Sequence, residues 1–274
     1  MMNDLQSWIG KTSTSEAYLD PAQANRMAAT LDRAPEFRRG DALPPAWHWL
    51  YFHDIARAAD LGDEGHPRLG LFMPPVPLPR RMWAGGSFEF RAPLRLGAVA
   101  ERVSTVRTIE QKHGRSGALC FVGVEHVLRA EGAVCLVEQQ TIVYRELERA
   151  TAVADAPPAP AAADFTRRYA LDSIALFRYS ALTFNGHRIH YDADYCRAVE
   201  GYPGLVIHGP LIATLLLDLY VAQGLPLGRF RYRARSPLFL PHAFSVCGSA
   251  GAGVARLWAA SHSGGLAMEA EAEA

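Results

Sequence analysis

The stretch that decides the fold runs from Pro210 to Val221 and reads PLIATLLLDLYV. Leu211, Leu215 and Leu219 recur at the spacing of one helix face, but the opposite face is almost equally apolar. A helix that is apolar on nearly all sides must be covered on nearly all sides. The sequence therefore predicts a buried helix here, and the neighbouring segments must supply its cover.

Segments typical of β-strands lie before and after this helix. In each of them apolar and β-branched residues alternate or run together, and glycines separate several of the segments. Glu131-Gly132 stands between two such segments and is typical of a tight hairpin turn. The final residues, MEAEAEA from Met268, are short and acidic, so we expect them to fray. The expected strands are Phe88–Leu96, Ala98–Glu110, Ala118–Ala130, Ala133–Arg145, Phe230–Leu238, Phe244–Ser249 and Val254–Ser261.

One change of composition divides the chain. Residues 150–164 read ATAVADAPPAPAAAD, and prolines in such a run exclude a helix interior or a central strand. We expect an extended linker there, between an N-terminal domain over residues 1–149 and a C-terminal domain over residues 165–274. Two pairs of matches suggest that the halves are duplicates. They join LDPAQANRMAATL from Leu19 to LDSIALFRYSALT from Leu171, and RAPLRL from Arg91 to RSPLFL from Arg235.

The first half also offers a helix before its strands, in the aromatic-rich residues from Pro45 to Ala59. Each half is then a long buried helix wrapped by a curved antiparallel sheet. This layout is the hotdog fold, which is of the α+β class, and two such units in one chain make a double hotdog.

Charge and composition exclude several classes of protein. The 28 Lys and Arg residues balance the 28 Asp and Glu residues, so nucleic acid is disfavoured as a partner. The four cysteines, Cys120, Cys135, Cys196 and Cys247, have no paired spacing and are expected to be reduced core thiols. No basic, apolar leader opens the sequence and its most apolar stretch is interrupted, so we expect a cytoplasmic protein with no membrane partner.

The residues that carry chemistry lie just before the buried helix. Asn185 and His190 stand five residues apart in a polar segment, and Gly209 comes where the helix begins. A histidine can move a proton at neutral pH, and a helix N-terminus offers free backbone N–H groups to an oxygen anion. This combination is suited to chemistry on a carbonyl compound.

Three strings of residues resemble one family. They are NGHRIHYD from Asn185, YPGLVIHGPL from Tyr202 and PRRMWAGG from Pro79. Together they are similar to the MaoC-like double-hotdog dehydratases and hydratases, and most to the FAS1-like dehydratase and mesaconyl-CoA (itaconyl-CoA) hydratase group. The resemblance implies a lyase that adds water to the 2,3 double bond of an acyl thioester, or removes it. Many members have Asp where this chain has Asn185, which cannot titrate.

The resemblance and the chemistry together imply a role for each residue. His190 acts as general acid and base, and Asn185 orients the attacking water with its amide. Pro210 has no N–H, which leaves Gly209 or Leu211 as the backbone donor. The resemblance implies that it is the N–H of Gly209 that polarises the thioester carbonyl and stabilises the enolate. This scheme needs no metal and no cofactor, and coenzyme A takes part only as a portion of the substrate.

The resemblance alone implies the substrate, a short branched dicarboxylyl-CoA such as mesaconyl- or itaconyl-CoA, which would give citramalyl-CoA. Its free carboxylate would need a cation, which Arg80, Arg81 or Arg178 could supply. The arginines that alternate along residues 229–235 could bind the phosphates of CoA, or they could form a solvated sheet face. Trp83 could stack on the ligand or belong to the core. The residues expected to bind substrate or CoA are Arg80, Arg81, Trp83, Arg178, His208, Arg233 and Arg235.

The first half lacks a counterpart of the Asn185 and His190 pair. At the duplicated positions it has Arg33 and Arg38. We therefore expect a degenerate N-terminal hotdog that shapes the pocket, and a C-terminal hotdog that keeps the chemistry. Because hotdog units tend to pair, we also expect a homodimer.

Other functions stay open from the sequence. A 3-hydroxyacyl-thioester dehydratase of fatty-acid type would act on a longer chain, a non-catalytic protein would only bind acyl-CoA, and a thioesterase would release the free thiol. His187, His190 and Asp192 could hold a metal, and Ser180, His190 and Asp192 could form a hydrolase triad. The spacing is typical of neither arrangement.

Overall fold

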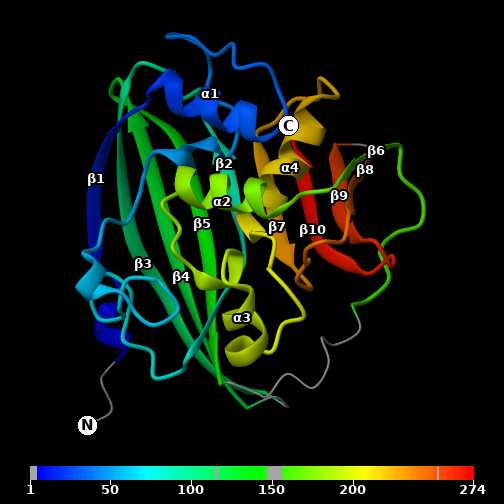
Figure 1. The fold of residues 1–274 in the computed structure, drawn as a ribbon. Coiled ribbons are helices and arrows are strands. Elements are labelled where there is room, and N and C mark those ends of the chain that lie inside the picture. Colours follow the sequence, from blue (N-terminus) through cyan, green and yellow to red (C-terminus); the bar gives the residue numbers. More distant parts are fainter. Residues whose placement is uncertain (1–4, 115–116, 147–155, 252) are drawn as a thin grey trace.

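The computed structural model describes residues 5–114, 117–146, 156–251 and 253–274. Within these residues ten strands form one antiparallel sheet in the order β1-β3-β4-β5-β2-β7-β10-β9-β8-β6 (Figure 1). The first half of the chain supplies β1 (Thr12–Tyr18), β2 (Arg80–Phe90), β3 (Val99–Gly114), β4 (Gly117–Ala130) and β5 (Ala133–Arg145). The second half supplies β6 (Phe165–Tyr169), β7 (Arg229–Ala234), β8 (Phe244–Ser249), β9 (Val254–Ser261) and β10 (Leu266–Glu273). The two halves meet where β2 pairs with β7.

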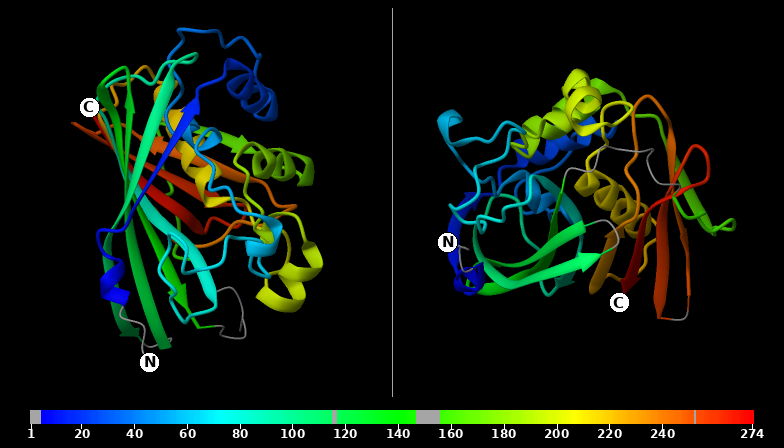
Figure 2. Two further views of the ribbon diagram at one scale, coloured as in Figure 1. Left: turned by 90° about the vertical axis from the view of Figure 1, so that its left-hand side faces the viewer. Right: turned by 90° about the horizontal axis from the view of Figure 1, so that it is seen from below.

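The α-helices lie on one side of this sheet, as Figure 2 shows. No helix in the described residues is long and apolar enough to cross a membrane. The helices are α1 (Pro21–Thr30), α2 (Ser173–Leu182), α3 (Ala193–Tyr195) and α4 (Gly209–Val221). Shorter turns are η1 (Leu5–Trp8), η2 (Trp47–Leu50), η3 (Ala58–Asp60), η4 (Arg188–His190) and η5 (Cys196–Glu200).

Helix α4 lies in the core of the second half, as its sequence predicts. Every residue from Leu211 to Tyr220 is buried, and the helix packs against β6, β8, β9 and β10. Burying one leucine side chain is worth roughly 1.5–3 kcal/mol, so this helix contributes strongly to stability. The carboxylate of Asp218 is buried with it and pairs with Arg33 of the first half at 2.8 Å.

The long helix expected over residues 45–59 is a wrong prediction. The structure has a single 3-10 turn at Trp47–Leu50, and the chain then leaves the helical path. His48 Nε2 lies 2.9 Å from Glu138 Oε2, and the Trp49 indole N–H donates to Glu138 Oε1 at 2.9 Å. These two hydrogen bonds tie the turn to Glu138 of strand β5. Tertiary contacts of this kind override a weak local preference for helix.

Most of the expected strands are present. The strands Ala133–Arg145, Phe244–Ser249 and Val254–Ser261 have the predicted ends, and a hairpin turn joins β4 to β5 at Glu131-Gly132, where both residues have positive φ. Strand β2, however, starts at Arg80 and ends at Phe90. Residues 80–87, which precede the expected start at Phe88, are therefore part of the sheet, and residues 91–96 are not.

The expectation that the C-terminal residues fray is also wrong. They form β10, which pairs with β7 on one side and β9 on the other. Met268, Ala270 and Ala272 are buried, and the glutamates between them lie opposite arginines of β7. Alternation with a period of two places the alanines in the core, and cross-strand charge pairs stabilise the other face.

The matched segments of the two halves have the same local structure. Asp20 and Asp172 each cap a helix, since Asp20 Oδ1 accepts from Ala22 N and Asp172 Oδ1 accepts from Ala175 N. The expected linker over residues 150–164 lies partly outside the described residues. From residue 156 the chain runs along the second half, where Ala159 packs against Trp258 and its neighbours.

The paired C-terminal strand leads to a stability test. Ala272→Asp would bury a charge at a position that is 0% exposed, so we expect it to lower the free energy of unfolding by several kcal/mol. Glu271→Gln, on the exposed face of the same strand, should change it by less than about 0.5 kcal/mol. Urea unfolding followed by circular dichroism measures both. Equal stabilities of the two variants would contradict the pairing of β10.

Candidate active site

The loop between α2 and η4 is shaped by Asn185. Its backbone N–H donates to the Ser180 carbonyl at 2.8 Å, and its Oδ1 accepts from the His187 N–H at 3.0 Å. The side-chain oxygen therefore closes an Asx turn. The Nδ2 group has no hydrogen-bond partner among the described residues, so it is left to donate to a water or a ligand.

His190 is held as a proton acceptor. It is buried in η4, and its Nδ1–H donates to the Val206 carbonyl at 2.8 Å. This hydrogen bond fixes the tautomer, because a carbonyl can only accept. Nε2 carries the lone pair and has no protein partner in the part of the chain that the structure describes. The sequence prediction that His190 can act as a base therefore has a matching geometry.

His208 supports His190 from one side. The two imidazole rings stack with centroids 3.6 Å apart and an interplanar angle of 18°. His208 is fully buried, and its Nε2 lies 2.8 Å from Ser180 Oγ. The hydroxyl of Ser180 is hydrogen-bonded to His208 and not to His190, and Asp192 pairs with Arg188 at 2.7 Å. The hydrolase triad of Ser180, His190 and Asp192 is therefore not formed. His208 positions the base, and its burial leaves it little room to touch a substrate.

Burial keeps the histidines of this site neutral. It lowers the pKa of His190 to about 4, although the hydrogen bond to Val206 opposes the shift. Burial, with further lowering from His190 and Arg81, brings the pKa of His187 to about 3. The pKa of His208 is also well below its usual range, again because the ring is buried. At neutral pH these rings carry no charge, and His190 is ready to accept a proton.

The start of α4 supplies hydrogen-bond donors beside these rings. Gly209 follows His208 directly, and Pro210 has no N–H. The N–H groups of Gly209 and Leu211 have no backbone partner within the described ranges, as expected in the first turn of a helix. Free N–H groups at the positive end of a helix dipole are suited to bind an oxygen anion.

Trp83 lies over this helix start. A Cβ atom at Gly209 would meet Trp83 Cε3 at 2.7 Å, so only glycine leaves room for the indole ring. The ring also stacks on Tyr232 with centroids 4.7 Å apart. Trp83 therefore packs on the core and also borders the start of α4. It combines the two roles that the sequence left open, a core residue and a residue that contacts the ligand.

A loop of the first half reaches the site, which the sequence did not reveal. Gly65 and Gly186 meet backbone to backbone, since a Cβ at Gly65 would lie 2.0 Å from the Gly186 oxygen. This contact brings the His66 ring to a centroid distance of 4.3 Å from His187. The only signal in the sequence is a single histidine between glycine and proline.

The arginines expected at the site fall into separate groups. Arg80 is buried and pairs with Glu200 at 3.1 Å, so it is a structural residue. Arg81 is half-buried on the side of β2 that carries Trp83, and Arg178 is exposed on α2. The structure thus places Arg81 near the site. Arg178 is close to Asn185 in the sequence, but its side chain is exposed to solvent.

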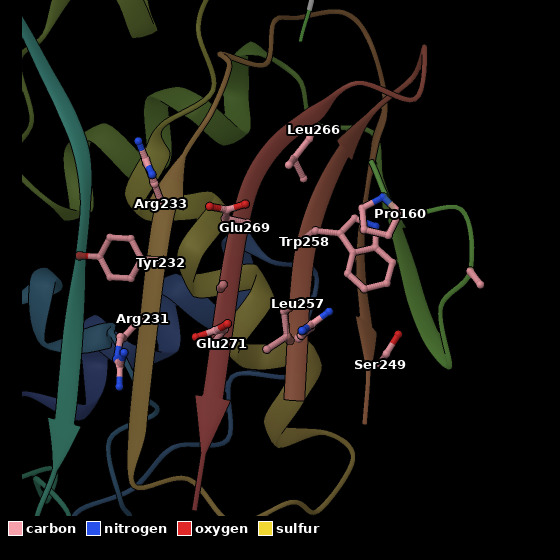
Figure 3. A pocket seen from close by; sticks show the side chains of 13 residues that line it. Pro160, Arg231, Tyr232, Arg233, Ser249, Leu257, Trp258, Leu266, Glu269 and Glu271 are labelled. Atoms are coloured by element: carbon pink, nitrogen blue, oxygen red, sulfur yellow. The ribbon is translucent and has the colours of Figure 1, made fainter. Parts of the chain in front are cut away.

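Arg233 and Arg235 are a correction to the expected site. Arg233 belongs to the exposed series on β7, where arginines alternate with buried Phe230 and Tyr232, and the exposed Arg235 follows directly after the end of that strand. Figure 3 shows this face, with Arg231 and Arg233 on the side away from the helices. It carries a hollow of about 610 Å³ in which Arg233 lies near Glu269, and Arg235 pairs with the same Glu269. The sheet separates these arginines from His190, because β7 turns Tyr232, not its arginines, toward Trp83.

The described residues offer no obvious metal centre. Among them, no group of three or more His, Cys, Asp or Glu side chains is placed to hold a metal ion. The arrangement expected of His187, His190 and Asp192 is not formed, since Asp192 turns to Arg188 and caps Tyr195 N at 2.9 Å.

Known proteins match this chain over most of its length. Residues 46–240 match the family described as hydroxyacyl-thioester dehydratase type 2. The chain is 45% identical over 241 residues to mesaconyl-C(4)-CoA hydratase of Chloroflexus aurantiacus, covering 86% of this chain and 85% of that protein. It is 26% identical over 233 residues to the mitochondrial hydroxyacyl-thioester dehydratase type 2 of Schizosaccharomyces pombe, covering 75% and 77%.

Solved structures confirm the expected double-hotdog fold. A MaoC-like dehydratase from Phytophthora capsici has a TM-score of 0.70 at 15% identity, covering 96% of this chain and 95% of that chain. HtdX from Mycobacterium tuberculosis has a TM-score of 0.68 at 17% identity, covering 95% and 98%. Another protein of that organism, described as a double hotdog, has a TM-score of 0.61 at 12% identity, covering 96% and 95%.

The buried imidazole leads to a titration test. We expect His190 to stay neutral with the proton on Nδ1 and to titrate at about pH 4, because burial disfavours its charged form. Nitrogen NMR of labelled protein reports both the tautomer and the titration, and His190→Gln assigns the signal. A titration near the ordinary value for histidine, about 6.5, would contradict this environment.

Proposed function

This chain belongs to the hydroxyacyl-thioester dehydratase type 2 family, and on that premise we propose that it hydrates the 2,3 double bond of a short dicarboxylyl-CoA. It is a hydro-lyase of the MaoC type. Mesaconyl-CoA is the preferred substrate in this proposal and itaconyl-CoA the alternative. The observation that carries it is the free Nε2 of His190, placed in the loop before the unpaired N–H of Gly209.

The reaction follows from these groups. The Gly209 N–H binds the thioester oxygen, with Leu211 N–H as the other donor in reach of the same helix end. Asn185 Nδ2 holds the water, and His190 Nε2 takes one of its protons while the oxygen bonds to C3. The electron pair of the double bond moves through C2 to the thioester oxygen and forms an enolate. His190 then returns the proton to C2, so that water is added in full, and dehydration is the same path reversed.

The low pKa of His190 suits the second step. Its neutral form accepts the proton only while the water oxygen is bonding to carbon. The imidazolium that results is a strong acid, because burial destabilises the charged ring. It therefore gives the proton readily to C2. A single histidine can in this way serve as base and acid, without the titrating carboxylate that Asn185 replaces.

The proposal also covers CoA binding, cofactors, oligomeric state and the roles of the two halves. Arg178, which we expected among the residues that bind substrate or CoA, is exposed on α2, and we propose that it contacts the CoA portion, since arginine binds phosphate oxygens in a fork. Coenzyme A is part of the substrate, and we propose no further cofactor. We also propose a homodimer in the cytoplasm, with a first half that shapes the pocket and a second half that carries the chemistry.

A panel of thioesters tests the substrate. We expect turnover of mesaconyl-CoA to exceed that of crotonyl-CoA and of a long-chain 2-enoyl-CoA, measured by loss of the enoyl absorbance. A preference for the long chain would favour the dehydratase of fatty-acid type, which the family name also describes. Release of free thiol would indicate a thioesterase, and tight binding without turnover would leave only an acyl-CoA-binding protein.

His190→Ala should lower kcat by roughly 10²–10⁴-fold, the usual worth of a positioned acid and base. The matched control is His262→Ala, because His262 is exposed at the turn between β9 and β10. Its turnover should equal that of the unchanged enzyme. Near-normal turnover of His190→Ala would remove this residue from the mechanism.

Asn185→Asp should move the acid limb of the pH profile of kcat/KM to higher pH. A carboxylate can still accept the His187 N–H and keep the loop, but its negative charge favours protonated His190 and raises the pKa of that ring. Less of the base is then free at acid pH. An unchanged profile would show that residue 185 does not face the reacting water.

A further inference from the structure

We propose that Arg81 and His66, both from the first half of the chain, form a subsite for the free carboxylate of the acyl group. This inference rests on the proposed function, because only a dicarboxylyl substrate carries that carboxylate. It assigns the choice of substrate to the half of the molecule that lacks the catalytic loop.

The strand geometry places Arg81 at the right distance. Arg81 and Trp83 share one face of β2, because side chains two residues apart on a strand point the same way. Trp83 lies against Gly209, where a Cβ would meet its ring at 2.7 Å. Two residues of strand advance about 6.6 Å, which the long side chain of arginine can span. A thioester held at the Gly209 N–H therefore has Arg81 within reach of the far end of a short acyl group.

Arg81 is a cation without a partner. It is half-buried, and no hydrogen bond or ion pair is made by its guanidinium within the described residues. Its neighbour Arg80 differs, since Glu200 pairs with it at 3.1 Å. A charge that is partly removed from water is stabilised by an opposite charge, so the guanidinium is suited to receive a carboxylate.

Two neutral groups with unused hydrogen-bonding capacity lie in the same region. Tyr144 stands directly opposite Arg81 across β2 and β5, is fully buried, and its hydroxyl has no partner in the described part of the chain. Nδ1 of His66 is likewise buried and unpartnered there, and Glu64 Oε1 is 4.0 Å from it, beyond hydrogen-bond distance. Buried polar groups normally have partners, so their convergence beside a cation points to a polar ligand.

Electrostatic effects connect these residues. Burial, and after it the positive charge of Arg81, hold the pKa of His66 well below its usual range. Burial raises the pKa of Tyr144, while Arg81 opposes the shift and Glu64 adds to it. Arg81 is thus close enough to act on both side chains. Glu64 is the acidic group of this region, and its side chain is one-third exposed, which screens it from the guanidinium.

Saturated substrate analogues test the subsite by binding alone. Succinyl-CoA and butyryl-CoA have the same number of acyl carbons, differ by a carboxylate against a methyl group, and cannot be hydrated. We expect succinyl-CoA to inhibit the enzyme at concentrations roughly 10–100-fold lower, the usual strength of a charged hydrogen-bonded pair. Arg81→Met should abolish this ratio of inhibition constants, and Arg81→Lys should keep part of it. His66→Leu should lower the ratio less, because the charge of Arg81 remains.

The ratio is measured within each variant, so a smaller folded fraction does not change it. Arg129→Met, at an exposed position on β4, should leave the ratio unchanged. If Arg81→Met keeps the preference while the unchanged enzyme hydrates mesaconyl-CoA, the subsite is overturned and the proposed function stands. If the unchanged enzyme hydrates other enoyl-CoAs but not mesaconyl-CoA, the proposed substrate itself is wrong.

Discussion

Helix α4 buries every residue from Leu211 to Tyr220, and this burial determines where chemistry can take place. The first N–H groups of a helix cannot be paired within it. In α4 these donors lie directly after the buried His208 and beneath the ring of Trp83. His208, the residue before the helix, is buried with it and stacks on His190. The proposed base and the proposed oxyanion donors are thus held by one packed unit.

The same burial sets the proton chemistry. It keeps His190, His187 and His208 neutral, so the site gathers several imidazoles without accumulating positive charge. His190 keeps its Nε2 free for a ligand, because Nδ1–H is taken by the Val206 carbonyl, and His208 stacks on its ring. Arg81, from the first half of the chain, is close enough to lower the pKa of His187. In the proposed mechanism the second half supplies the base and the N–H donors, and the first half supplies Trp83 as a wall and Arg81 as a cation.

Local patterns in the sequence predicted what depends on local structure. The run from Pro210 to Val221 predicts α4, because an all-apolar helix has no alternative to burial, and the position of Gly209 follows from where that run begins. The C-terminal residues look frayed from the sequence, because alanine is only weakly apolar and gives little sign of a buried strand face. Their alternation with glutamate becomes a strand only when the arginines of β7 face it. The helix expected from Pro45 failed because Glu138, far along the chain, binds two successive side chains of the turn.

The sequence by itself determined the buried helix and most of the strands, and it marked Asn185, His190 and Gly209 as candidates, because each of these features lies within a short segment of the chain. Only the tertiary structure decided which arginine belongs to the site. Arg81, Arg178 and Arg233 are equally charged in the sequence, but strand direction and helix packing turn one toward the catalytic loop, leave one in solvent and place one behind the sheet. Likewise His66 reaches His187 only because two glycines let distant loops touch. Such contacts join residues far apart in the chain, and nothing in local periodicity encodes them.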